Sequence, residues 1–307
     1  MSRFLKSVGE AEGNRGRNHF AWERIDRAAG ERPYRVLAVV SNKGGVGKTT
    51  VATNLAVYLR GLREDLPILV VGFDEQPTID RMFSLGPNGG AESVCAGMRS
   101  GSFSSASRLG QYGVHYVPTD PSVAELKREI WSHEHLEQVL HHTGWQGLVI
   151  VDTKSDLEIL TRNALSASDL AIVVVKDRAS VIEAARVYEL MEGWRRPRDR
   201  VRILLSLVDL RVRYANGGNK DVLALLVEEI RRQGYPMFRT FLSRSPKIES
   251  LHTNPEATNL SILHNAPGSL VHRQMLYLAE EVLEALDLTG AKSEAAAGAS
   301  AGRPLHA

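Results

Sequence analysis

The stretch VLAVVSNKGGVGKTTVATNLAVYL, residues 36–59, joins an apolar run to a helical pattern through a glycine-rich turn. The run VLAVV has the composition of a buried β-strand, and the apolar residues that follow position 49 recur with helical spacing. Gly44, Gly45 and Gly47 let the backbone bend tightly and turn its N–H groups toward an anion. A strand, a glycine-rich turn and a helix in this order are the context of a phosphate-binding loop.

Two lysines lie in this loop, although one subunit needs only one of them to bind a nucleotide. Lys48 opens the helix, where it would reach the β- and γ-phosphates, and the Thr49 hydroxyl is placed to hold Mg²⁺. Asn42 stands where the usual G-x-x-x-x-G-K-[ST] pattern has its first glycine. Lys43 has no obvious task within one subunit, because Lys48 already neutralises the phosphates. The residues expected to bind ATP are Lys43, Gly44, Gly45, Val46, Gly47, Lys48, Thr49 and Thr50.

Short apolar runs alternate with helical patterns along the rest of the chain. Five more such runs are bounded by turn signals, at residues 67–74, 114–118, 147–153, 170–176 and 201–208. Continuous apolar strands separated by helices indicate a parallel sheet that is covered on both faces. We therefore expect the α/β class, with one doubly wound, mostly parallel sheet over residues 34–288. A mobile N-terminal arm, 1–33, and a disordered Ala/Gly-rich tail, 289–307, are expected to flank it.

Composition excludes several classes of protein. The net charge of +2 over 307 residues is too small to indicate nucleic-acid binding by itself, so any DNA contact requires a local basic patch. The single cysteine, Cys95, excludes an internal disulfide and fits a reducing compartment. No apolar run approaches the roughly 18–20 residues of a membrane span. These features predict a cytoplasmic protein.

The segment KGGVGKTT, residues 43–50, resembles the deviant Walker A motif of the ParA/MinD family of P-loop ATPases. That family also tolerates the missing first glycine. The resemblance implies that Lys43 crosses a nucleotide-sandwich homodimer and touches the phosphates bound by the partner subunit. ATP occupancy would then control dimerisation. The resemblance covers about residues 34–288 and is strongest in the first half.

The segment ILVVGFDEQPT, residues 68–78, is similar to the family's Asp-x-Asp-Pro-Gln run. Asp74 and Gln76 match the second Asp and the Gln, whereas Gly72 and Glu75 replace the first Asp and the Pro. The resemblance implies that Asp74 positions the attacking water, and a carboxylate near Mg²⁺ and the γ-phosphate is suited to that task.

The segment 147–175 resembles the Walker B strand and switch II region of the same family. Asp152 at the end of the strand would hold Mg²⁺ through water. Lys154 and Ser155 occupy the positions where the family has paired prolines, which leaves the timing of γ-phosphate sensing open. The predicted catalytic residues are Lys43, Asp74 and Asp152. The predicted Mg²⁺ ligands are Thr49, Asp74 and Asp152.

Basic residues gather in the second half of the chain, which favours the partition branch of the family. Phosphate contacts to duplex DNA need such point charges and no particular bases. By its place in the chain, FRTFLSR (238–244) indicates Arg239, Arg244 and the following Lys247 as DNA-contacting residues, with the arginines between 195 and 202 in reserve. An ATP-bound homodimer would bind nonspecific DNA, position a plasmid, chromosome or protein assembly, and respond to a ParB-like or adaptor protein. This function implies association with the nucleoid.

The alternative is a nucleotide-switched regulator of the MinD-like type, which acts through a protein partner or the membrane without DNA. The last helix, predicted over 269–288, is amphipathic, but its polar face carries Glu280, Glu281, Glu284 and Asp287. Anionic lipid would repel such a face. We therefore expect the helix to pack on the sheet and the chain to have no stable membrane anchor. We expect the DNA-binding, cargo-positioning function, and a gel shift with random-sequence DNA, with and without ATP, would separate it from this alternative.

Overall fold

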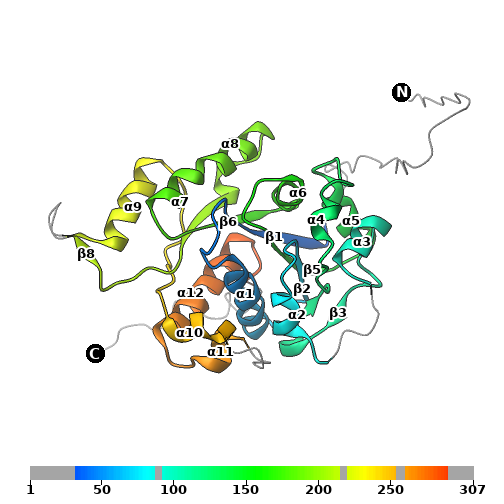
Figure 1. Cartoon of the computed structure of the whole chain (residues 1–307), viewed down its shortest axis with the longest axis horizontal. Coiled ribbons are helices and arrows are strands. Elements are labelled where there is room, and N and C mark those ends of the chain that lie inside the picture. The colour runs from blue at the N-terminus through cyan, green and yellow to red at the C-terminus, as the bar shows by residue number, and fades with distance from the viewer. Residues whose placement is uncertain (1–31, 87–91, 215–219, 254–259, 290–307) are drawn as a thin grey trace, which may run out of the picture. The chain divides into compact units, whose positions relative to one another are not determined.

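A central β-sheet organises the chain (Figure 1). The computed structural model describes residues 32–86, 92–214, 220–253 and 260–289. Within them, seven strands form one sheet in the order β3-β4-β2-β5-β1-β6-β7, and all neighbours are parallel except β3 and β4. The strands are β1 (Tyr34–Val40), β2 (Ile68–Gly72), β3 (Arg108–Leu109), β4 (His115–Tyr116), β5 (Gly147–Asp152), β6 (Leu170–Val175) and β7 (Val201–Leu205).

The predicted N-terminal arm and C-terminal tail lie outside the described residues, except for positions 32, 33 and 289. Arg32 forms ion pairs with Glu137 and Asp169. The carbonyl of Pro33 accepts a hydrogen bond from the backbone N–H of Gly147, 3.1 Å away. These contacts attach the chain to the sheet immediately before β1 begins.

Helices cover both faces of the sheet, and the strand side chains alternate between two apolar clusters. In β1, Val36 and Ala38 belong to one cluster, and Leu37 and Val39 belong to the other. The first face is covered by α3 (Val94–Ser100), α4 (Val123–Leu126), α5 (His135–Thr143), α6 (Ile159–Ala167), α7 (Arg178–Glu183), α8 (Ala185–Gly193) and α9 (Val222–Arg232). The second face is covered by α1 (Lys48–Leu62), α2 (Thr78–Phe83), α10 (Pro246–Ser250), α11 (Ile262–Asn265) and α12 (Leu270–Ala285). The predicted doubly wound α/β fold is confirmed, because burial on both faces accounts for the continuous apolar runs. A short antiparallel hairpin, β8 (Arg213–Tyr214) with β9 (Lys220–Asp221), precedes α9.

The strand order places three loops at one edge of the sheet. β1 lies between β5 and β6, so the strand order reverses at β1. In open α/β sheets, ligands bind beyond the carboxyl ends of the strands at the position where the strand order reverses. Asp152, the last residue of β5, is in register with Val39 of β1 and with Gly72 of β2. The segments that follow these three strands therefore begin side by side.

The C-terminal helix α12 lies beside α1 and packs toward the sheet, as the sequence predicts (Figure 1). Met275 and Leu278 are fully buried in the cluster that includes α1. Glu281, which the sequence places on the polar face of this helix, is only 6% exposed. Its carboxylate accepts hydrogen bonds from the backbone N–H groups of Arg239 and Thr240, both at 2.8 Å, which replace the lost contacts with water. Among the described residues, no helix combines the length and the apolar character that a membrane span requires.

Candidate functional site

The loop between β1 and α1 has a backbone that glycine alone adopts readily. Gly45 and Gly47 have φ angles of 66° and 92°, in the left-handed region. Gly47 is the N-cap of α1 and supplies no side-chain hydrogen bond, so the first N–H groups of the helix point out of the turn without a capping side chain. Val46 between them is fully buried and holds the loop against the core. The loop thus presents backbone donors and the positive end of a 15-residue helix to an anion.

Lys48, the first residue of α1, is buried at 7% exposure. Its Nζ donates a hydrogen bond to the Ser155 hydroxyl at 2.5 Å. Burial lowers the pKa of this lysine, and the negative charges of Asp152, Asp74 and Asp156 oppose that shift. The anionic neighbours favour the charged form of this buried lysine, which suits it to bind phosphate.

The Asp152 carboxyl group is more deeply buried than the other charged side chains of the site. It is 1% exposed, and neither carboxylate oxygen makes a hydrogen bond of standard geometry among the described residues, although the Thr49 hydroxyl lies close to it. Burial raises its pKa to about 7, with the Thr49 hydroxyl and Lys48 acting in the opposite direction and Asp74 adding to the rise. A buried carboxylate without hydrogen bonds is costly unless a cation compensates for it. The donor set of Asp152 and Thr49 consists of oxygen atoms, which Mg²⁺ prefers.

Asp74 lies two residues beyond the end of β2 and is half-buried. It acts on the pKa values of both Lys48 and Asp152, so its charge belongs to the same site. Its Oδ1 accepts a hydrogen bond from the backbone N–H of Gln76 at 3.1 Å. The packing explains why position 72 is a glycine, because a Cβ there would lie 2.3 Å from the Cδ1 of buried Ile79. An aspartate there would force Ile79 to repack.

Lys43 lies in a different environment from Lys48. Its Nζ is 2.6 Å from Oδ2 of Asp177, and the Lys43 side chain is 36% exposed. Asp177 also caps the N-terminus of α7, where its side chain accepts a hydrogen bond from the backbone N–H of Ser180. Lys176 approaches the same loop, since its Nζ donates to the carbonyl of Gly45 at 3.0 Å. Sequence reasoning missed both Lys176 and Asp177, although their place directly after strand β6 would have been a usable signal.

The basic residues predicted to contact DNA are exposed but have acidic neighbours. The Arg239 side chain is 76% exposed and lies 2.9 Å from the Glu284 carboxylate. The Arg244 side chain is half-exposed and makes two hydrogen bonds to Glu249, at 3.0 and 3.2 Å. Lys247 is exposed on α10. These pairs reduce the positive potential that each arginine would present to a phosphate backbone, and the DNA assignment stays a prediction.

Known proteins share this sequence pattern and fold. A family model described as an AAA domain matches residues 34–193. The chromosome-partitioning ATPase Soj of Thermus thermophilus is 27% identical over 252 residues, which are 81% of this chain and 95% of that protein. The chromosome partitioning protein ParA of Caulobacter vibrioides is 25% identical over 206 residues, 62% of this chain and 76% of that protein.

Solved structures with the same fold include the ATP complex of an McdA variant from Cyanothece. Its TM-score is 0.66 at 12% identity, over 85% of this chain and 99% of that one. The chain belongs to the AAA-domain family matched at residues 34–193 and, within it, to the ParA/MinD group of P-loop ATPases, as the loop at 43–50 predicts.

Replacement of Asp152 by asparagine is expected to stabilise the protein in the absence of ligands. Because the folded-state pKa of about 7 exceeds the ordinary aspartate pKa of 3.8, the native state binds more protons between these two pH values, and the parent loses stability as the pH rises through this window. At pH 8, Asp152→Asn should therefore raise the free energy of unfolding by about 1–2 kcal/mol, less than the full shift because Lys48 loses a neighbouring negative charge. At pH 4 the difference should vanish.

Urea denaturation at the two pH values measures this difference. The exposed Asp199 supplies the control, since Asp199→Asn should change the free energy of unfolding at neither pH. An Asp152→Asn variant that is no more stable than the parent at pH 8 would contradict the assignment of a buried, uncompensated carboxylate.

Proposed function

We propose that this chain is an ATPase that dimerises when it binds ATP, binds DNA without sequence preference, and positions or segregates a cargo. A partner protein stimulates hydrolysis and thereby releases the dimer from DNA. The chain belongs to a group of ATPases, and the name of the Thermus relative, chromosome-partitioning ATPase, supports the cargo-positioning part of this function.

Different residues of the site bind the nucleotide and promote its hydrolysis. The backbone N–H groups of residues 44–50 and the ammonium of Lys48 bind the phosphates. Thr49 and Asp152 would hold Mg²⁺, which would supply positive charge beside the phosphates. Asp74, close enough to influence both Lys48 and Asp152, orients the attacking water.

The contrast between the two lysines supports the dimer most directly. Lys48 is buried near carboxylates, whereas the Lys43 side chain is partly exposed and forms an ion pair with Asp177. A lysine at the surface of a phosphate loop is available to the phosphates of a second subunit. Lys43 must leave Asp177 to make that contact, so the Lys43–Asp177 pair opposes dimerisation until ATP compensates for its loss.

A second function is favoured by one specific observation. Arg239 and Arg244 each lie against a glutamate, which weakens the case for a DNA-binding face. MinD of Pyrococcus horikoshii, solved with Mg-ADP, shares the fold with a TM-score of 0.62 at 19% identity, over 84% of this chain and 99% of that one. A nucleotide-switched regulator that acts through a protein partner or the membrane, without DNA, is therefore the alternative.

Substitution of the two lysines should separate nucleotide binding from dimerisation. Lys48→Ala should weaken ADP binding at least roughly thirtyfold, because the phosphates lose a buried charge partner. Lys43→Ala should retain ADP affinity and lose ATP-dependent dimerisation. Asp177→Asn should instead favour ATP-dependent dimerisation and dimerise at about threefold lower protein concentration than the parent. Asparagine still caps α7 but no longer forms an ion pair with Lys43.

Fluorescent ADP titration and sedimentation velocity with a slowly hydrolysed ATP analogue measure the two quantities. Equal loss of ADP affinity in Lys43→Ala and Lys48→Ala would show that Lys43 serves its own subunit and would contradict the cross-dimer role.

DNA binding is the test of the proposed function. With ATP, the parent should bind random-sequence duplex DNA with an affinity that falls steeply with salt, with a slope of about −0.9 per phosphate contact in log K against log salt. Arg239→Glu and Arg244→Glu should weaken binding to all sequences alike and leave dimerisation unchanged. Arg99→Glu is a matched control, because Arg99 is likewise exposed and paired with a glutamate, Glu129.

A gel shift with and without ATP gives the result. A parent protein that dimerises with ATP but binds no DNA, even at low salt, would overturn the partition function and leave the regulator in its place.

A further inference from the structure

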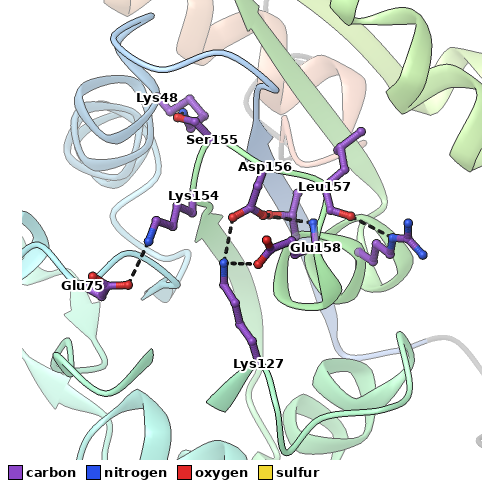
Figure 2. Close-up of polar contacts among 10 residues, drawn as sticks. Lys48, Glu75, Lys127, Lys154, Ser155, Asp156, Leu157 and Glu158 are labelled. Carbon is purple, nitrogen blue, oxygen red and sulfur yellow. Dashed lines mark hydrogen bonds and ion pairs between the residues drawn. The ribbon is translucent and has the colours of Figure 1, made fainter. Parts of the chain in front are cut away.

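Three consecutive residues after β5 connect to three separate elements (Figure 2). Lys154 forms an ion pair with Glu75, Nζ to Oε1 at 2.9 Å. Ser155 accepts the hydrogen bond of Lys48 on α1. Asp156 Oδ2 lies 2.9 Å from Nζ of Lys127, which follows α4. This short segment therefore contacts the segment after β2, the phosphate loop helix and the chain beyond α4 at the same time.

The Glu75–Lys154 pair extends the contact between β2 and β5 beyond the end of the sheet. Gly72 and Asp152 are in register, and the backbone N–H of Phe73 donates to the carbonyl of Asp152 at 2.9 Å. Past this point the two segments have no ladder hydrogen bonds to hold them together. Glu75 and Lys154 join them there, and the hydrogen bond and charge of Lys154 lower the pKa of Glu75.

The position of this pair relates it to Asp74 and Asp152. Glu75 is the immediate neighbour of Asp74, and Lys154 lies two residues after Asp152. The pair thus joins the segment that carries one carboxylate of the site to the segment that carries the other. Both members stand where the family pattern has proline, so this chain lacks two residues that would each fix one backbone φ angle. The two replacements have opposite charges and meet.

We propose that Glu75 and Lys154 are positioning residues for ATP hydrolysis, because their ion pair holds Asp74 in place relative to Asp152. The inference rests on the proposed ATPase function. Neither side chain is required to bind the nucleotide, which the loop backbone and Lys48 hold. Loss of the pair should therefore lower kcat and leave nucleotide affinity unchanged. Because both side chains are 38% exposed, the pair is screened by salt and its contribution is modest.

The experiment is a charge swap that tests whether the interaction itself matters. Glu75→Lys and Lys154→Glu should each lower kcat about fivefold, while the affinity for fluorescent ADP stays within about twofold of the parent. The double variant, with the pair reversed, should recover to within about twofold of the parent kcat. The gap between parent and single variants should narrow at high salt. Glu75→Gln and Lys154→Gln remove the charge without reversing it, so they should also lower kcat, but by less than the charge-reversal variants.

A matched swap at Arg99 and Glu129, an exposed pair between α3 and the segment after α4, should leave kcat unchanged in all three forms. Single variants at 75 and 154 that hydrolyse ATP at the parent rate would overturn the inference, as would a double variant as slow as the singles. A parent protein that binds no ADP and releases no phosphate from ATP would instead contradict the proposed function. The two failures are therefore distinguishable.

Discussion

The burial of two opposite charges, Asp152 and Lys48, at one edge of the sheet is the constraint on which the site depends. Asp152 is removed from water without a hydrogen bond within the described chain, and Lys48 is removed from water with one hydroxyl as its direct partner. Each buried charge is unfavourable in isolation. The Asp152 carboxylate is suited to bind a metal cation, and the Lys48 ammonium is suited to bind a phosphate. The free protein is therefore destabilised at the place where binding would relieve the cost.

The fold creates this arrangement by its strand order. Parallel pairing of β1 with β5 and of β2 with β5 brings three strand ends to one place, and the glycine turn after β1 directs the first turn of α1 toward them. The surrounding contacts link this place to the rest of the domain, through Asp177 to α7 and through Lys127 to the chain after α4.

Much of the fold and part of the site could be predicted from the sequence, because they depend on local patterns. The apolar runs and the glycine spacing of residues 44–47 are short-range signals, and the sheet and loop they predict are present. The contacts of Lys43 with Asp177 and of Lys154 with Glu75 join residues 134 and 79 positions apart, and no local pattern specifies such pairs. The burial of Glu281 could not be predicted for a related reason, since helical periodicity does not reveal that the backbone of residues 239 and 240 binds its carboxylate.

We propose that Asp152 is reserved for a metal cation that binds with the nucleotide. Calorimetric titration of the parent with ADP and Mg²⁺ at pH 7, in two buffers of different ionisation enthalpy, measures the protons exchanged on binding. Because burial raises the pKa of Asp152 to about 7, this carboxyl is partly protonated in the free protein and must ionise to hold Mg²⁺, so binding should release protons. The release should be smaller in the Asp152→Asn variant, in which only other groups, such as the terminal phosphate of ADP, can lose protons. Tight binding of ADP that neither requires Mg²⁺ nor releases protons would contradict the claim.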